Sequence, residues 1–242
     1  MPTEDDTPLL GRAATDGDSV WVRDQRSIPD VTGDERLYRR LLDAVAVMTS
    51  GGVHADESYQ RTLREIRDDT EFIEILLRTA DSLPEEAYEE RWALTQLAVD
   101  LQHPRTAEYL AGLVRRPVPP ERAEDPGHGQ STVTEEVILR TTAIEGLARL
   151  ARDGTDATQG QVQSLLESLL ETLDSTPYLS LRRAAWFALI DSGDEDAIGR
   201  ARDALARRGE EWVTTMRRIP VEEAPQADPT SPDREVPPPI DG

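Results

Sequence analysis

The feature that most constrains this chain is a residue pattern that recurs along it. Residues 182–189 read Arg-x-x-Ala-Trp-x-x-Leu, and residues 140–147 repeat the pattern 42 positions earlier with Ile in place of Trp. A third version, with Glu in the first position, occupies residues 90–97, and the Pro/Gly-rich loop at residues 117–131 accounts for its wider spacing. Apolar residues three and four positions apart lie on one face of a helix. The recurrence therefore predicts stacked units of paired helices.

The clearest unit is the stretch at residues 182–208, which contains a helix end and a helix start within six residues. Gly193 is suited to end the first helix in a left-handed conformation. Asp194 is suited to cap the second helix, and acids follow it where the helix dipole favours them. These signals predict a helical hairpin with its turn at Gly193.

The same reasoning predicts further helices along the chain. Their ranges are 34–50, 56–83 with a break near 68–70, 84–102, 104–116, 133–152, 162–173 and a short last helix at 210–219. Asp34 is the expected cap of the first, Thr70 of the helix after the break, and Ser82 with Glu85 has the spacing of a capping box. Residues 56–83 form either a hairpin or one long bent helix, and the hairpin is favoured.

The segments at the two ends differ from the helical middle. Residues 1–33 have prolines and glycines without a helical period, which predicts an irregular arm with a short extended piece at residues 19–23. Trp21 in that arm either folds back on the helices or contacts a partner. Residues 220–242 contain seven prolines and few apolar side chains, which predicts a flexible tail.

The repeat resembles the HEAT-repeat family in its short prokaryotic form, with Arg-x-x-Ala, a Gly/Asp turn and a second helix. The resemblance is good over residues 84–208 and weaker over 34–83, and it departs at the widened turn of residues 153–160. It implies an all-α solenoid of three to four hairpins over residues 34–219. It also implies a concave face formed by the second helices. The partner-binding residues expected there, together with the arm, are Trp21, Arg105, Glu108, Gln161, Arg200 and Arg202.

Large apolar residues beside the repeated alanines predict the core of these units. The expected core residues are Trp92, Trp186, Phe187 and the leucine stripe of residues 165–173. A ligand pocket near Trp92 or Trp186 is the alternative interpretation.

The charge balance restricts the classes of partner. All 27 basic residues are Arg, against 48 acidic residues, which gives a net charge of −21. This opposes binding to nucleic acid or anionic lipid, because both need clustered positive charge. The acidity has two interpretations, adaptation to high salt or a surface for a partner. Scattered Arg doublets would favour nucleic acid only if they converged on one face.

The sequence has no run of apolar residues long enough to span a membrane and no basic leader at its start, which predicts a soluble, cytoplasmic protein. It lacks cysteine and lysine, which excludes disulfides, thiolate metal sites and a phosphate loop that needs lysine.

No catalytic pattern is present among the remaining polar residues. His54, His103 and His128 are not at metal-ligand spacing, and the neighbours Asp68 and Asp69 are unremarkable in so acidic a chain. We therefore expect no catalytic, cofactor or metal site. The expected function is a non-enzymatic scaffold or accessory subunit that binds another protein, in a larger complex. The alternative is a small-molecule-binding or lyase-type protein that uses a cleft between repeats.

Overall fold

The computed structural model describes residues 12–13, 21–22, 28–51, 54–124, 131–153 and 159–216. The elements in chain order are β1 (Arg12–Ala13), β2 (Trp21–Val22), α1 (Glu35–Met48), α2 (Ala55–Ile66), α3 (Thr70–Ser82), α4 (Tyr88–Leu101), η1 (Pro104–Thr106), α5 (Ala107–Arg115), α6 (Thr132–Asp153), α7 (Gln159–Ser175), α8 (Leu179–Ser192), α9 (Glu195–Arg207) and η3 (Glu211–Thr215). Helices dominate the described chain, which confirms the all-α class.

The N-terminal arm contributes the short strands and one core residue. β1 and β2 pair in antiparallel fashion, with Trp21 opposite Ala13, which confirms an extended piece at this position. Ile28 is buried and its carbonyl accepts a hydrogen bond from the Tyr38 hydroxyl on α1. The tail predicted from residue 220 onward lies outside the described residues.

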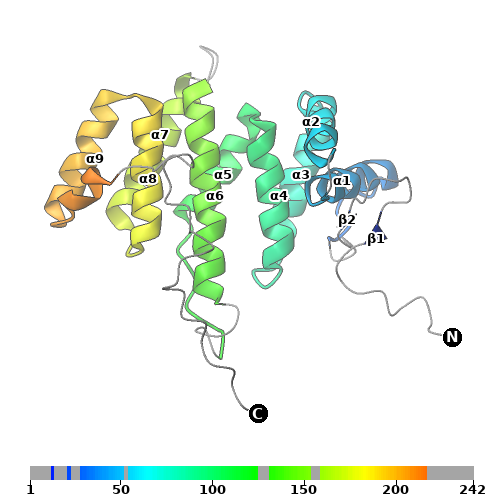
Figure 1. The fold of residues 1–242 in the computed structure, drawn as a ribbon, viewed down its shortest axis with the longest axis horizontal. Coiled ribbons are helices and arrows are strands. Elements are labelled where there is room, and N and C mark those ends of the chain that lie inside the picture. The colour runs from blue at the N-terminus through cyan, green and yellow to red at the C-terminus, as the bar shows by residue number, and fades with distance from the viewer. Residues whose placement is uncertain are drawn as a thin grey trace, which may run out of the picture.

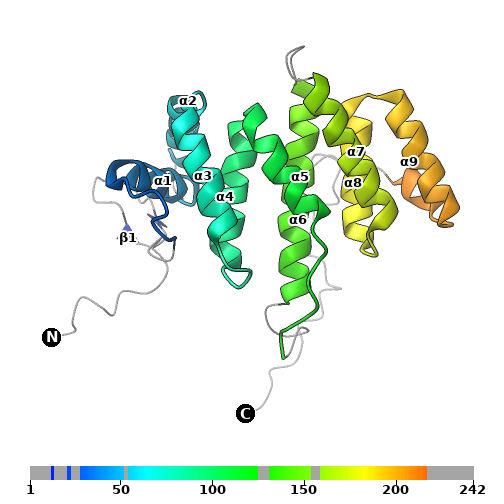
Figure 2. The same cartoon turned by 180° about the vertical axis from the view of Figure 1, so that it is seen from behind.

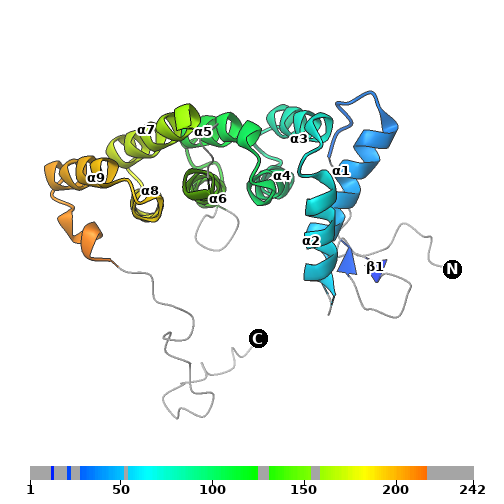
Figure 3. The same cartoon turned by 90° about the horizontal axis from the view of Figure 1, so that it is seen from above.

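The helices from α3 onward are arranged in two facing rows (Figure 3). α3, α5, α7 and α9 lie side by side in one row, and α4, α6 and α8 lie in the other. α6 contacts α4, α5 and α8, and α7 contacts α5, α8 and α9, so each helix packs on neighbours in both rows. Figures 1 and 2 show the successive pairs following one another from α3 to α9. The array is bowed, and we call the side of α4, α6 and α8 that faces away from the other row the inner face.

The caps predicted for α1, α8 and α9 form as expected. Asp34 precedes α1 and accepts hydrogen bonds from the backbone N–H groups of Arg36 and Leu37. Gly193 ends α8 with φ of +70°. Asp194 then caps α9 by accepting a bond of 2.8 Å from the Ala197 N–H. The predicted hairpin at residues 182–208 is thereby confirmed.

Three predicted boundaries are wrong. The Ser82 hydroxyl donates to the Thr79 carbonyl, so Ser82 closes α3 and forms no capping box, and α4 begins only at Tyr88. Asp69, not Thr70, caps α3, because its carboxylate is placed to accept from the Phe72 N–H. The described part of the last predicted helix forms the 3₁₀ helix η3, and residues 217–219 lie outside the described chain.

The break near residue 68 is present, but the helices on either side of it have different partners. α2 packs mainly against α1, whereas α3 packs against α4. The interruption at residues 67–69 therefore separates an N-terminal pair, α1 and α2, from the two-row array. Periodicity detects such a break without specifying which helix each side pairs with.

The core contains most of the residues predicted for it. Trp186 is 2% exposed and lies in one cluster with Leu165, Leu169 and Leu173. Trp92 and Phe187 are only half-buried, so the prediction for them holds in part. Trp92 packs against both hydrophobic clusters of the chain, between the α1–α4 region and the α5–α9 region.

Buried arginines recur at one position of each helix of the inner row. Arg91 on α4 donates to the Glu85 carbonyl at 3.1 Å, and Arg182 on α8 donates to the Thr176 carbonyl at 2.6 Å. Arg140 on α6 donates to the carbonyls of residues 116 and 117 at 3.2 and 2.9 Å. Each arginine thus donates to backbone carbonyls in the connection that follows the preceding helix of the other row.

Glu136 joins two of these arginines. Its carboxylate accepts hydrogen bonds from Arg91 and from Arg140, and all three side chains are buried. Burial by itself raises the pKa of Glu136, but the hydrogen bonds and positive charges of the two arginines outweigh it and leave the pKa lowered. The result is a charged network, Arg91–Glu136–Arg140, that connects α4 to α6.

Glu121 caps the N-terminal end of α6, although it lies well before that helix in the sequence. Its carboxylate accepts from the Ser131 hydroxyl and from the backbone N–H groups of Thr132 and Val133 at 3.0 and 3.4 Å. The Ser131 hydroxyl first, then the N–H of Ala123, and then the two α6 groups lower the pKa of Glu121 to about 2. The helix therefore binds the ionised form of this side chain.

We expect Glu121→Gln to destabilise the chain in a pH-dependent way. Because the folded pKa of about 2 is below the ordinary 4.5, the stabilisation is complete above pH 4.5 and is lost as the pH falls toward 2. The difference in urea midpoint between wild type and variant should shrink over that interval. Glu124→Gln, at a nearby exposed glutamate, controls for removal of a charge. A difference that stays constant down to pH 2 would contradict the capping role.

Candidate functional site

The largest hollow described on the inner face is a groove between α6 and α8. Its volume is about 700 Å³, and its wall includes a side chain from beyond α9. The lining residues are Val137, Ile138, Thr141, Thr142, Glu145 and Ala148 of α6, Ser180, Arg183, Ala184, Phe187 and Ala188 of α8, and Met216 after η3. We call this the α6–α8 groove.

Helical spacing explains why these side chains share the groove. Positions three and four apart on α6 and on α8 bring one stripe of each helix to the gap between them. Small residues, Ala184 and Ala188, line the groove from α8 together with the larger Phe187, and Ile138 lines it from α6. Ile138 is 45% exposed, which is high for a large apolar side chain.

The groove is weakly charged compared with the chain as a whole. Glu145 and Arg183 are the charged residues among those that line it, and they carry opposite charges. Thr141, Thr142 and Ser180 add hydroxyl groups beside the apolar stripe. An apolar centre with a few polar groups at its margin is typical of surfaces that bind polypeptides.

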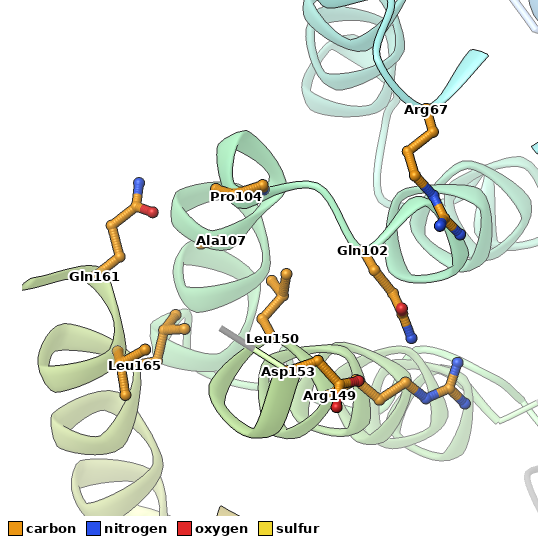
Figure 4. Close-up of a pocket in the computed structure, with 10 residues that line it drawn as sticks. Arg67, Gln102, Pro104, Ala107, Arg149, Leu150, Asp153, Gln161 and Leu165 are labelled. Atoms are coloured by element: carbon orange, nitrogen blue, oxygen red, sulfur yellow. The ribbon is translucent and has the colours of Figure 1, made fainter. Parts of the chain in front are cut away.

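A second hollow, the end pocket, lies near the C-terminal ends of α4 and α6 (Figure 4). Its volume is about 210 Å³. Arg67, Gln102 and Arg149 lie on one side and Gln161 on the other, with Leu150 and Leu165 between them. It is thus enclosed by residues from several helices.

Arg149, one of the polar residues that line the end pocket, is committed to a structural contact. Arg149 donates to Asp100 at 3.2 Å, and Asp100 also accepts from the Tyr59 hydroxyl at 2.8 Å and from Gln96 at 3.0 Å. Burial, and then the negative charge of Asp100, raise the pKa of Tyr59, so the hydroxyl stays protonated as the donor. This cluster links α2, α4 and α6.

The residues predicted to bind a partner do not gather in one place. Glu108 and Gln161 lie together at a hollow of about 260 Å³ between α5 and α7. Arg105 on η1 pairs with Glu74 on α3 at 2.5 Å. Arg200 and Arg202 are exposed on α9. Trp21 lies in β2, and the surroundings of its side chain are outside the described part of the chain.

The row that contains these residues also differs from the expectation. α5, α7 and α9 lie side by side as predicted for second helices, but on the outer side of the bow in Figure 3. The inner face is formed by α4, α6 and α8 instead. Sequence reasoning placed Phe187 in the core and did not select Ile138 or Met216. The available signal was the pair Trp186–Phe187, because adjacent helical residues point about 100° apart, so one of the two lies nearer the margin of the core-facing stripe.

The described residues offer no arrangement for metal chemistry. No group of three or more His, Asp or Glu side chains among them is placed to hold a metal ion. His54 stands at the start of α2 beside Glu57, and His103 accepts from the Arg105 N–H at the start of η1. His128 lies outside the described residues. Within the described chain no helix is both long and apolar enough to cross a membrane.

The arginine doublets differ in their surroundings, and Arg207 at the end of α9 pairs with Asp174 of α7 at 3.9 Å. Arg182 is buried, and Arg183 lies in the α6–α8 groove. Arg115 and Arg116, at the end of α5, pair with Glu171 at 3.7 Å and Asp81 at 3.2 Å. The doublet at residues 217–218 lies outside the described residues. Comparison with protein-family models, with curated proteins and with solved structures finds no match to this chain.

Proposed function

We propose that this chain is a non-enzymatic scaffold or accessory subunit that binds another protein through the α6–α8 groove. The observation that carries the proposal is the groove itself, an open channel with exposed Ile138 and half-buried Phe187 on its walls. Helix pairs commonly bind partner segments through such apolar channels. The partner is a polypeptide segment that presents apolar side chains, in a cytoplasmic complex.

The recurring arginines support a HEAT-like solenoid as the framework. Arg91, Arg140 and Arg182 lie on three successive helices of the inner row, and each donates to a carbonyl in the connection after the preceding helix. Repeat arrays of this type present extended inner surfaces to their partners. On this interpretation the inner face, with α6 and α8 at its centre, is the binding surface.

The alternative, a ligand cleft near Trp92 or Trp186, gains little from the structure. Trp186 is enclosed in the core, and neither Trp lines the end pocket. The end pocket also uses Arg149 to hold Asp100. Among the described lining residues, Asp153 has a pKa lowered by hydrogen bonding to Arg152, which suits an ion pair better than proton transfer.

A photo-crosslinking amino acid introduced at Ile138 or Thr142, in cells that make the protein naturally, tests this proposal. We expect adducts of one discrete mass from both groove positions. The same amino acid at Arg200 or Arg202 serves as the control, because these exposed positions lie on the outer row. Free monomer from all four positions would overturn the proposal, and adducts from α9 alone would assign binding to the outer row.

The identified partner must then bind the purified chain through the groove. We expect Ile138→Glu to weaken binding by about tenfold or more, because an apolar contact is replaced by a charge. Its melting temperature should stay near that of wild type, since Ile138 is partly exposed. Equal affinity of wild type and Ile138→Glu would contradict a role for the groove.

A further inference from the structure

The α6–α8 groove has one wall that does not come from either helix. Met216, the residue after η3, lines it together with Ile138 and Phe187. Figure 3 shows η3 turning from α9 toward the side of the array on which α8 lies. The chain therefore leaves its last described element at the groove, and residue 217 begins there.

The residues that follow Met216 have the composition of a groove ligand. Residues 217–223 read Arg-Arg-Ile-Pro-Val-Glu-Glu, so the apolar residues Ile219, Pro220 and Val221 lie between a basic and an acidic pair. The lining of the groove has the same classes of residue, an apolar stripe with one acid, Glu145, and one base, Arg183. Pro220 favours an extended backbone and limits the entropy that docking costs.

The length of the groove agrees with the length of the segment. The α6 wall runs from Val137 to Ala148, which corresponds to about 16 Å at the rise of an α-helix. Residues 217–221, extended as a polyproline-type segment, span about 16 Å. A segment that starts at Met216 can thus follow the groove without an intervening linker.

We infer that residues 217–221 of this chain occupy the α6–α8 groove in the free protein and that a partner must displace them. Ile219 and Val221 then cover the apolar stripe formed by Ile138, Ala184 and Phe187. The site is taken from the proposed function, whereas the self-contact itself needs no partner. A partner that binds the groove then competes with this segment for the same apolar stripe.

The covalent attachment of residues 217–221 beside the groove strengthens their binding to it. A segment attached directly beside its site has an effective concentration of the order of 1 mM. An intrinsic Kd of about 0.1 mM then keeps the groove about nine-tenths occupied and weakens a competing ligand about tenfold. A modest intrinsic affinity is therefore sufficient.

The test uses the full chain and a fluorescent peptide of residues 217–226. In one variant, Ile219→Asp with Val221→Asp, the segment can no longer fill the groove. In the matched control, Val236→Asp with Ile240→Asp, the same charge is added elsewhere in the proline-rich region. Peptide binding is followed by fluorescence anisotropy at one salt concentration, with circular dichroism to compare helix content.

We expect the peptide to bind the Ile219→Asp/Val221→Asp chain about tenfold more tightly than it binds wild type or the control variant. A peptide with the same two Asp substitutions should not bind. Adding Ile138→Glu to the Ile219→Asp/Val221→Asp chain should abolish binding of the unmodified peptide. Equal affinity of the peptide for wild type and the two double variants would overturn the inference. No binding of the peptide to the Ile219→Asp/Val221→Asp chain would overturn it as well. Because no partner is present, such a failure leaves the crosslinking proposal intact, and a failure of crosslinking leaves this result intact.

Discussion

Glu136→Gln is expected to lower the free energy of unfolding by about 3–5 kcal/mol, the range measured when one member of a buried ion pair is removed. Glu136 is 2% exposed and lies between Arg91 and Arg140, which are buried with it. The amide keeps the shape of the carboxylate but carries no charge, and Arg remains protonated at any ordinary pH. Two buried cations would then face each other without an anion. Urea unfolding at neutral pH gives the free energy directly.

The control for this prediction is an ion pair with the same chemistry on the surface. Glu35 and Arg39 on α1 are separated by 2.7 Å, and both are largely exposed. Glu35→Gln should cost no more than about 1 kcal/mol, since water and salt screen an exposed pair. A cost of similar size for both substitutions would show that the Arg91–Glu136–Arg140 network is solvated and contributes little.

Gly146→Ala is the second large effect, with an expected loss of about 1–3 kcal/mol from overpacking. A Cβ atom at Gly146 on α6 would lie 2.5 Å from a methyl carbon of Val99 on α4 and 3.0 Å from one of Leu110 on α5. α6 therefore approaches both helices too closely for any larger residue. Alanine also has a higher helix propensity than glycine, which stabilises the helix by about 1 kcal/mol. The steric cost of the added methyl group must exceed this gain for Gly146→Ala to destabilise the chain.

Two other helical glycines provide the opposite expectation. A Cβ atom at Gly112 on α5 or at Gly199 on α9 would meet no atom within 4 Å. Alanine at either position should stabilise the chain by about 0.5–1 kcal/mol, because it removes backbone freedom from the unfolded state. Melting temperatures of the three variants, measured side by side, should move in opposite directions. A rise for Gly146→Ala would mean that α6 can shift away from α4.

Features fixed by neighbouring residues are the ones that the sequence predicts well. Gly193 and Asp194 form the turn between α8 and α9 as expected, because a left-handed end and a side-chain cap need only local chemistry. Ser82 shows the limit of such signals, since its hydroxyl can close the helix before it as readily as cap the one after it.

The buried arginines show what a repeat register alone misses. Aligning the units placed Glu90 opposite Arg140 and Arg182, but the buried arginine that donates to the preceding connection is Arg91, one residue later. A shift of one residue is invisible when the neighbouring alanines and leucines still match. Glu136 is harder still to foresee, because its role depends on α4 and α6 lying side by side, which only the packed structure defines.

The groove was missed for a related reason. Phe187 belongs to the same helical turn as Trp186, and both satisfy an apolar pattern. Only the position of α6 shows that Trp186 faces the other row while Phe187 faces the groove. The partner-binding residues predicted from the resemblance followed the second helices, and the bow of the array places those helices on its outer side.

The carbonyl bonds of Arg91, Arg140 and Arg182 also give the array a polarity. In all three cases the acceptor precedes the arginine in the chain, so each unit completes the end of the helix before it. Removing a unit from the C-terminal end therefore takes away a donor and leaves carbonyls of the remaining chain unsatisfied. Removing one from the N-terminal end takes away the acceptors instead and frees an arginine, whose long side chain can reach solvent. The two ends of the array are thus chemically different: a shortened C-terminal end presents carbonyl acceptors, and a shortened N-terminal end presents an arginine donor.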